Sequence, residues 1–435
     1  MNKTVFNNII YVSDGRIRRA DITIEDEYIV RIDDKEELPS SKLSTSSILI
    51  PGVIDDHIHS REPGMTHKGD LTSETRAAAA GGVTSVMDMP NVVPQTTTLE
   101  ALAARQELGR EHAFVNYTFY FGATNTNAHL LRQLDATAVP GVKLFMGSST
   151  GGMLVDHGEA LHAIFEQSPL IIMAHCEDTA IINRNNQQWP DGNLPIELHP
   201  QIRSEEACFA SSSLAVTMAT ETGARLHIAH ITTARELQAF AHLSPRITLE
   251  ACLPHLLFTD EDYARLGALI KCNPSVKTRA DRDALRQGLT DGSITLVGTD
   301  HAPHLLSEKQ GGARHAVSGI PMVQFSLVSM MQLSEEGVLP VEQVVELMCH
   351  APARLFGIEH RGFIREGMKA DLAVLSRQDW TLTSEQIHSR CGWSPLEGRT
   401  FSWRINQTYC NGRLIYDQGQ FADGNRHAQA LRFAV

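Results

Sequence analysis

The segment DDHIHSREPG at residues 55–64 combines residue types that bind metal ions and anions. His57 and His59 stand two apart and Arg61 follows two residues later, so on a β-strand the three side chains would share one face. Two imidazoles on one face are typical of a metal site, and a guanidinium beside them can hold a carboxylate. A chance pair is the alternative, because the chain contains 20 histidines.

A lysine inside an apolar stretch is the second candidate for chemistry. Lys143 lies in GVKLFMG at residues 141–147, where a charged amine is costly to bury. Burial lowers the pKa of an amine, and a neutral amine can capture carbon dioxide to form a carbamate whose two oxygens bridge two divalent ions. A lysine that reaches solvent along its own stem, or that forms a salt bridge, is the alternative.

Three further apolar runs end in a histidine or an aspartate. His175 closes LIIMAH, His230 closes LHIAH, and Asp300 follows ITLVGT. Taken singly, His175 would be a hydrogen-bonded core histidine and Asp300 the N-cap of a helix. His227 and His230 are three apart and face opposite ways on a strand, so we expect His230 to reach the strand end and His227 to be a core or supporting residue.

The rest of the sequence predicts the elements that would position these residues. Eight short apolar runs, most of them followed by helix-like segments, occur in this order: SILIPGVIDDHIH, GGVTSVMDMPN, FVNYTFYFGAT, GVKLFMG, PLIIMAHCED, ARLHIAHITT, RITLEACLPH and SITLVGTDHAPH. Apolar strands that alternate with helices indicate a parallel sheet buried on both faces, and eight units predict an α/β fold, the (β/α)8 or TIM barrel. A doubly wound open sheet is the alternative, but it needs a glycine-rich turn after its first strand, and DDHIHSREPG is not one.

In a barrel the carboxyl ends of all strands meet at one face. The polar residues at these ends should therefore lie around one mouth: His57, His59, Arg61, Asn91, Lys143, His175, His230, Asp300 and His304. Imidazoles and carboxylates that converge from several strands predict a metal site, and this agreement favours the chemical interpretation of each residue over its structural alternative.

Both ends of the chain have the pattern of β-structure. TVFNNIIYV and RRADITIEDEYIVRIDD precede the barrel pattern, and GFIREGMKADLAVLS and RTFSWRINQTYCNGRLIYDQG follow it. Asn411-Gly412 between two apolar runs predicts a tight hairpin turn. We expect residues 1–50 and 353–435 to form one small β-rich domain beside a barrel at residues 51–352.

Composition narrows the classes of partner. A net charge of −13 argues against nucleic acid or an anionic membrane as the main partner. The N-terminal MNKTVFNNIIYVSDG lacks the apolar stretch of a signal peptide, and no apolar run is long enough for a bilayer. Seven cysteines without a C-x-x-C pair fit reduced thiols. We therefore expect a cytoplasmic protein that acts on a small molecule.

At this point the residues resemble the amidohydrolase superfamily, in which H-x-H on the first strand, lysine on the fourth, histidines on the fifth and sixth and aspartate on the eighth form the site. Within it, HIHSREPG, GGVTSVMDMPN and TDHAPH are similar to the dihydroorotase family, and GVKLFMGSSTG with IRSEEAC resembles its lysine-bearing bacterial branch. The similarity runs from about Pro51 to Pro352, and GMKADLAV resembles the superfamily's small β domain.

The resemblance implies a role for each position. One zinc ion would be bound by His57, His59 and Asp300 and a second by His175 and His230, with carbamylated Lys143 bridging the two. Asp300 would also act as the general base. The substrate contacts would be Arg61, Asn91, Asn273 and His304. The implied activity is the reversible, zinc-dependent hydrolysis of dihydroorotate to N-carbamoyl-aspartate in pyrimidine biosynthesis, by a homodimer.

Two departures from the family pattern and three alternative functions stay open. ACLPHLLF lacks the paired histidines common in relatives, and NPSVKTRADR lacks their usual proline pair and arginine, which affects Asn273. A hydantoinase or dihydropyrimidinase would share the metals but needs no arginine at position 61, because its ring carries no carboxylate. Allantoinase is a nearer rival. Inactive dihydroorotase-like partners of aspartate transcarbamoylase lose metal ligands, whereas this chain has the full set.

Overall fold

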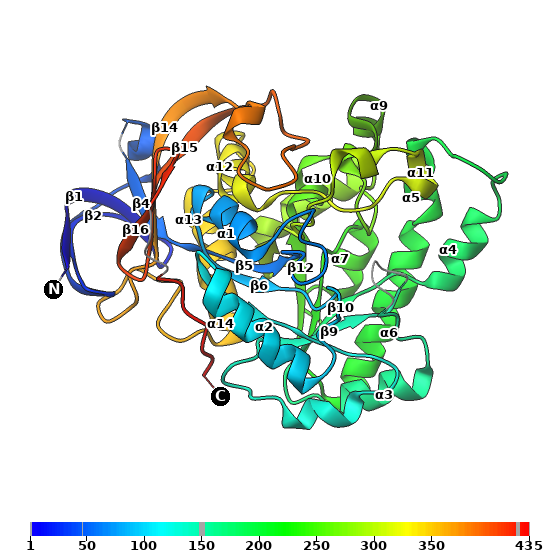
Figure 1. Ribbon diagram of the computed structural model, residues 1–435. Helices are drawn as coiled ribbons and strands as arrows, with labels where there is room; N and C mark the ends of the chain where they lie inside the picture. The colour runs from blue at the N-terminus through cyan, green and yellow to red at the C-terminus, as the bar shows by residue number, and fades with distance from the viewer. Residues whose placement is uncertain (1, 46, 148–152, 423–426, 435) are drawn as a thin grey trace.

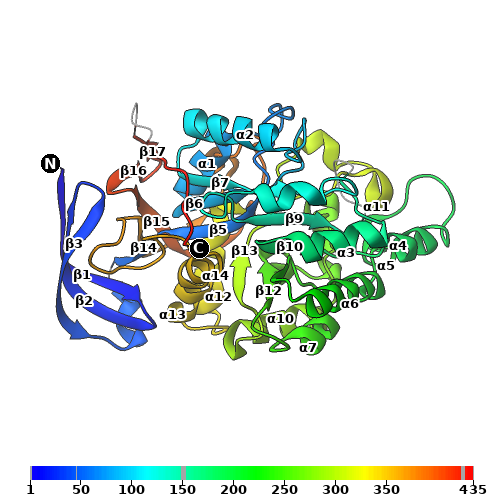
Figure 2. The same ribbon diagram turned by 90° about the horizontal axis from the view of Figure 1, so that it is seen from below.

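The structure is a computed structural model that describes residues 2–45, 47–147, 153–422 and 427–434. A ring of parallel strands surrounded by helices makes up one side of the molecule, and a long, mostly antiparallel sheet makes up the other (Figures 1 and 2). Positions 148–151, which end the motif GVKLFMGSSTG, lie outside the described residues.

Each of the eight apolar runs contains one strand of the ring. These strands are β5 (Val53–Ile58), β6 (Val83–Asp88), β7 (Asn116–Phe119), β9 (Gly141–Phe145), β10 (Ile171–His175), β11 (Leu226–Ile228), β12 (Ile247–Cys252) and β13 (Leu296–Gly298). The short β8 (Phe121–Gly122) continues the β7 run and pairs with β9. The ring closes between β13 and β5, where the His59 N–H donates to the His301 carbonyl at 2.7 Å. The barrel prediction is confirmed, and the open sheet is excluded.

Helices cover the outside of the ring because their apolar faces seal the strands from water. The long ones are α1 (Leu71–Ala80), α2 (Leu99–His112), α3 (Gly158–Gln167), α6 (Glu205–Thr222), α10 (Arg279–Asp291) and α12 (Ser326–Glu335). Shorter ones are α4 (Thr179–Asn186), α5 (His199–Ile202), α7 (Ala234–Phe240), α8 (Leu253–Leu257), α9 (Tyr263–Leu266), α11 (Gly312–His315), α13 (Val341–Val345) and α14 (Ala351–Phe356). Side-chain caps begin several of them: Asp70 accepts from the Ser73 N–H, and Thr278 from the Asp281 N–H.

The second sheet is built from both ends of the chain. Its order is β17-β16-β15-β14-β4-β1-β2-β3. The bounds are β1 (Lys3–Ser13), β2 (Arg16–Glu25), β3 (Tyr28–Glu37), β4 (Ile48–Pro51), β14 (Leu372–Thr381), β15 (Thr400–Cys410), β16 (Arg413–Asp417) and β17 (Gln420–Phe421). The predicted turn joins β15 to β16, with positive φ at Asn411 (50°) and Gly412 (73°). We retain residues 1–50 and 353–435 as one domain and 51–352 as the other, as a proposal.

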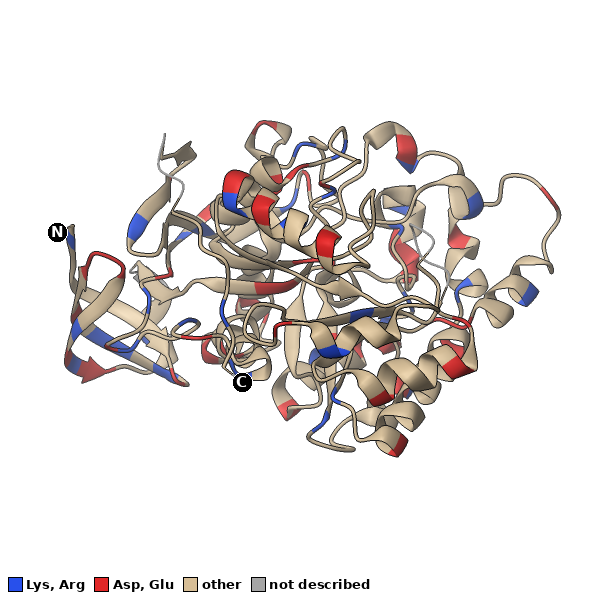
Figure 3. Ribbon diagram, turned by 60° about the horizontal axis from the view of Figure 1, so that its bottom comes forward, with Lys and Arg blue, Asp and Glu red and all other residues tan. Residues whose placement is uncertain are grey.

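Charged residues are interspersed over the surface elements. Figure 3 shows acidic and basic residues interspersed over the sheet next to the N-terminus and over the helices. Many form exposed ion pairs across neighbouring strands, such as Arg18 with Asp34 and Lys35 with Asp21. Among the described residues, the structure has no helix with the length and apolarity needed to cross a membrane.

One buried ion pair under the barrel mouth predicts a large effect on stability. Arg105 of α2 pairs with Asp88 at the end of β6, and both side chains are almost completely buried. We expect Arg105→Met to lower the free energy of unfolding by about 3–5 kcal/mol, because it leaves a buried carboxylate without its partner. Arg110→Met is the matched control on the same helix, since Arg110 pairs with Glu107 at the exposed surface. Urea denaturation measures both variants, and equal midpoints would contradict the prediction.

Candidate functional site

A cavity of about 50 Å³ lies at the carboxyl ends of the barrel strands. Every candidate residue except His304 lines it, and the complete lining is His57, His59, Arg61, Asn91, Lys143, Phe145, His175, His230, Asn273, Asp300, Ala302, Ser318 and Gly319. His304 lies directly behind Arg61. The structure thus brings together the residues that the sequence placed at one mouth.

His57, His59 and Asp300 form the first group of possible ligands. The Nε2 atoms of His57 and His59 lie 3.3 Å and 3.0 Å from the same oxygen, Asp300 Oδ1. Burial lowers the pKa of His59 to about 4, so its imidazole is neutral at pH 7 and its lone pair is available to a metal. Burial alone would raise the pKa of Asp300, but His57 and His59 hold it below its ordinary value, which keeps the carboxylate ionised.

His175 and His230 form the second group. His175 ends β10, and its Nδ1 lies 3.0 Å from Nε2 of His230, which follows β11. Burial lowers the pKa of both histidines, and neighbouring positive groups lower that of His230 further. Two neutral imidazoles at this distance share one N–H···N hydrogen bond, and a metal ion would take the lone pairs of both facing nitrogens in place of that proton. They form a natural pair of ligands for one divalent ion.

Lys143 lies near both groups, since its charge lowers the pKa of His57 and of His175. It is fully buried on β9, and its Nζ has no hydrogen-bond partner among the described residues. The ring centre of Phe145 is 5.2 Å from Nζ. Burial lowers the pKa of this amine. The alternatives of a solvent-reaching lysine or a simple salt bridge do not fit this environment, whereas an amine converted to a metal-bridging carbamate does.

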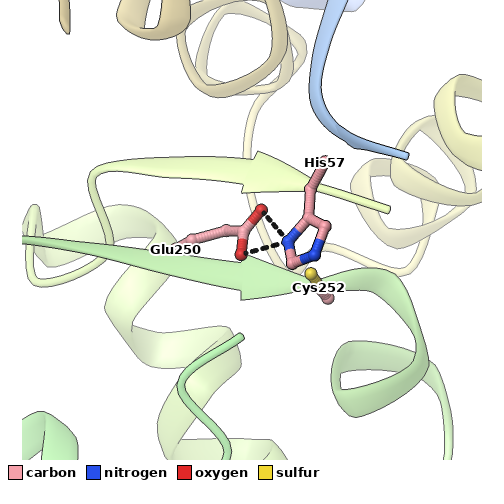
Figure 4. A group of neighbouring side chains, drawn as sticks. All are labelled: His57, Glu250 and Cys252. Carbon is pink, nitrogen blue, oxygen red and sulfur yellow. Dashed lines mark hydrogen bonds and ion pairs between the residues drawn. The ribbon is translucent and has the colours of Figure 1, made fainter. Parts of the chain in front are cut away.

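Two glutamates that the sequence interpretation missed hold the histidines in place. Glu250 of β12 lies 3.0 Å from His57 Nδ1, and it accepts the His230 backbone N–H at 2.7 Å, so it touches both groups. Figure 4 shows the Glu250 carboxylate facing the His57 ring, with the buried Cys252 thiol beside the same ring. On the other side, Glu177 lies 3.1 Å from His175 Nε2 and pairs with Arg203.

A carboxylate on the far nitrogen of an imidazole fixes the orientation and proton position of a metal-binding histidine. The Glu250 carboxylate also raises the pKa of His57 against the opposing effect of burial. The sequence signal for Glu250 was a glutamate inside the apolar run RITLEAC, since such a charge needs a buried partner. For Glu177 the signal was weaker, a glutamate two residues after His175.

Arg61 gives one end of the cavity a positive charge, and His304 lies behind it. Arg61 Nη2 lies 2.9 Å from His304 Nε2, and its Nε donates to the Pro303 carbonyl at 3.0 Å. The other ring nitrogen of His304 lies 3.1 Å from Lys68 Nζ. Burial lowers the pKa of Arg61 to about 10, which still leaves it charged at neutral pH.

The two asparagines occupy different walls. Asn91 follows β6, and its Oδ1 lies 2.8 Å from His59 Nδ1. Asn273 lies beyond β12, and its Oδ1 accepts from the Ser318 hydroxyl at 3.0 Å. Both face the cavity, although the segment after Asn273 departs from the pattern of the resembling family.

One part of the sequence interpretation is wrong, because Arg61 does not share a strand face with His57 and His59. β5 ends at Ile58, and Arg61 has a left-handed backbone with φ 72°. The backbone also turns at His230 (φ 40°) and Asp300 (φ 46°). Non-glycine residues rarely adopt this conformation, and those that do cluster at functional sites. His227 is a core residue as predicted, with Nδ1 2.8 Å from Thr248 Oγ1.

Comparison with known proteins places the chain among relatives of similar length. Residues 48–415 match the Amidohydrolase family. An allantoinase from Bacillus velezensis is 30% identical over 420 residues, which cover 94% of this chain and 92% of the relative. A dihydroorotase from Methanosarcina acetivorans is 32% identical over 411 residues, covering 90% and 87%, and one from Lactobacillus helveticus is 29% identical over 429 residues, covering 96% and 100%.

Solved structures agree in fold. The L-hydantoinase (dihydropyrimidinase) from Arthrobacter aurescens has a TM-score of 0.91 and 24% identity, covering 98% of this chain and 99% of its own. The dihydropyrimidinase from Brevibacillus agri has a TM-score of 0.88 and 22% identity, with complete coverage of both chains. These similarities establish the fold, a TIM barrel with a β-rich domain. The sequence match over most of the chain shows that this protein belongs to the amidohydrolase family.

Proposed function

We propose that this protein is a cytoplasmic dihydroorotase that hydrolyses (S)-dihydroorotate reversibly to N-carbamoyl-L-aspartate in pyrimidine biosynthesis. The observation that carries the proposal is the environment of Arg61. Its guanidinium is buried at the cavity wall, and it forms no ion pair with a carboxylate of the described residues. The acidic residues that follow Arg61 in the sequence have other partners, since Glu62 pairs with His112 and Asp70 with Arg390. Such a guanidinium fits the carboxylate of a substrate.

His304 strengthens this interpretation. A neutral imidazole accepts one hydrogen bond, yet both ring nitrogens of His304 face donors, Arg61 and Lys68. Burial lowers the pKa of His304, and these two cations lower it further, so a second proton on the ring is unfavourable. Lys68 already pairs with Glu308 at 2.7 Å, so an anion bound at this end of the cavity would balance the charge of Arg61, which has no carboxylate partner among the described residues.

A hollow beside the cavity has basic residues in its wall. This hollow of about 440 Å³ shares Asn273 and Ser318 with the site, and Arg203, Lys271 and Arg314 lie in its wall. Basic residues beside a site raise the local concentration of an anionic substrate. Dihydroorotate and its ring-opened product are both anions, whereas dihydrouracil, hydantoin and allantoin carry no carboxylate.

The donor set fits two divalent ions, and we propose zinc. One ion would be held by His57, His59 and Asp300 and the other by His175 and His230, with carbamylated Lys143 between them. Bound zinc supplies Lewis-acid chemistry that activates water and polarises the amide carbonyl. Asp300 would take the proton of the attacking water and pass it to the departing ring nitrogen. Arg61, His304, Asn91 and Asn273 would orient the ring. Assembly as a homodimer stays a prediction.

A direct assay tests the proposal against its rivals. Purified, zinc-loaded protein is offered dihydroorotate, dihydrouracil, hydantoin and allantoin, and ring opening is followed for each. We expect dihydroorotate to have the highest kcat/KM, because a buried polar site penalises analogues that leave it unfilled. A higher kcat/KM for allantoin or for either uncharged ring would overturn the assignment.

The carbamate predicts a chemical signature of its own. Protein loaded with zinc in ¹³C-bicarbonate should show a carbamate carbonyl resonance in NMR, and this signal should be absent from Lys143→Ala. The same variant should bind less zinc, since it lacks the bridging group, and should lose hydrolysis. Short carboxylic acids added with zinc should partly restore activity by occupying the vacated space. A fully active wild-type enzyme with an unmodified Lys143 amine would contradict the prediction.

A further inference from the structure

A second cavity, which we call the seam cavity, lies between the barrel and the β-rich sheet and shares no lining residue with the cavity at the barrel mouth. It has a volume of about 180 Å³. Gln324 and Phe325 at the start of α12 form one wall, and Trp380, Arg404 and Tyr416 of the sheet form another. The segment at residues 385–388 forms a third. In Figure 1 α12 lies beside β15, against which it packs.

The aromatic walls of this seam cavity are held in fixed positions. Trp380 stacks on Phe401 with ring centres 5.3 Å apart, and its indole N–H donates to the Trp403 carbonyl at 2.7 Å. Tyr416 and His388 both pack against Phe421, with ring centres at 5.3 Å and 5.0 Å. Because the rings contact one another, their faces are arranged before any ligand arrives.

Arg404 supplies positive charge at the same place. Its guanidinium forms no side-chain hydrogen bond or ion pair with the described residues, although it lines the cavity and is only partly exposed. Other arginines of this sheet are paired, for example Arg377 with Glu335. Glu385 is the acidic residue in the lining, and it forms no ion pair with Arg404 within the described structure. A guanidinium beside aromatic faces is the combination that recognises an aromatic anion.

We propose that the seam cavity binds a small planar aromatic anion, with its ring against the aromatic walls and its carboxylate or phosphate on Arg404. The volume is adequate, since an apolar protein cavity of about 150 Å³ accepts benzene, and the seam cavity is larger by roughly the size of an anionic group. A ring with a single anionic substituent therefore matches both the space and the charge.

Hydrogen bonds link two walls of the seam cavity to His301, the residue that follows Asp300. Next to His388, the Ser389 hydroxyl and the Arg390 N–H donate to the Glu74 carboxylate at 2.5 Å and 3.1 Å. Glu74 lies 2.8 Å from Nε2 of His301, the residue after Asp300. On the other wall, Val323 precedes Gln324 and donates its N–H to His301 Nδ1 at 3.3 Å. A ligand that shifts either wall therefore acts on His301, and we infer that occupancy changes the turnover of the enzyme.

Calorimetric titration of the zinc-loaded protein tests binding directly. Benzoate and phenyl phosphate are the probes that distinguish a carboxylate from a phosphate ligand, and benzamide and cyclohexanecarboxylate are their uncharged and non-planar counterparts. We expect at least one aromatic anion to bind at one site per chain, and both counterparts to bind at least about tenfold more weakly. Failure of both aromatic anions to bind at millimolar concentration would overturn the proposal.

Variants locate the bound probe. Arg404→Gln should weaken binding about tenfold or more, whereas Arg413→Gln on the neighbouring strand β16 should leave it unchanged. Arg61→Met should also retain binding, which separates the seam cavity from the barrel mouth. Binding that survives Arg404→Gln but is lost in Arg61→Met would place the probe in the catalytic cavity and refute the seam site.

Kinetics test the connection to Asp300. A saturating probe should change kcat of the wild-type enzyme by about twofold or more, and Ser389→Ala should bind the probe with unchanged affinity but show a smaller change in kcat. Binding without any change in kcat would overturn the connection while leaving the site in place. Because the titration does not depend on the substrate, failure of the dihydroorotase assignment and failure of the seam site are separate results.

Discussion

His57→Ala, His175→Ala and Asp300→Ala should each lower kcat/KM for ring opening by about a thousandfold or more. The three residues come from β5, β10 and the end of β13, yet their side chains line one cavity. Each substitution removes a ligand from a proposed metal position, and Asp300→Ala also removes the proposed general base. Steady-state rates together with zinc content per chain, measured by mass spectrometry, check the expectation.

The control for these variants is a histidine outside the site. His162 lies on the exposed face of α3, so His162→Ala should retain both zinc and activity. Circular dichroism should show that all four variants are folded, because three substitutions are at the barrel mouth and the fourth is on the exposed face of α3, so none is in the core between the barrel and its helices. Full activity of the wild-type protein after rigorous chelation would refute the metal centre altogether.

Arg61→Met should weaken transition-state binding of dihydroorotate by about 3–5 kcal/mol, which is measured as the fall in kcat/KM. This is the usual effect of removing one partner of a buried charge pair. Dihydrouracil is nearly the same ring without the carboxylate, so the variant should lose far less activity with it. The preference of the wild-type enzyme for dihydroorotate should therefore largely disappear. The measurement is kcat/KM of the wild-type enzyme and of the variant, each with dihydroorotate and with dihydrouracil.

Zinc content is the internal control for Arg61→Met. The guanidinium contacts Pro303 and His304 and no proposed metal ligand, so the variant should bind zinc as the wild type does. An equal loss of activity with dihydroorotate and with dihydrouracil would show that Arg61 does not recognise the carboxylate. The dihydroorotase assignment would then fail, while membership of the amidohydrolase family would stand.

Local sequence patterns predicted the barrel because each strand is buried on both faces and therefore appears as an apolar run. They predicted the gathering of the site residues for a topological reason: parallel strands of a closed barrel all end at one face. His57 and His230 are distant in sequence, yet this rule alone brings them to one cavity. The prediction required no knowledge of contacts between individual residues.

The features that were missed depend on contacts between elements. The position of Glu250 under both histidine groups follows from the register of β12 against its neighbours, which the run RITLEAC does not encode by itself. The inward direction of Arg61 depends on a left-handed turn, and alternation along a strand predicts side-chain direction only while the strand continues. The seam cavity combines segments from both domains and had no sequence signal.

The placement of β4 between β1 and β14 has a consequence for biosynthesis. Pro51 of β4 pairs with Leu372 of β14, about 320 residues later in the chain. At a synthesis rate of about 5–20 residues per second, the ribosome needs roughly 15–65 seconds to deliver that partner. During this interval the nascent chain presents an unpaired apolar edge, ILIP, that can pair with other chains. β4 is thus made early, but its second edge is paired only after β14 has been made, and this edge is where a chaperone would protect the nascent protein.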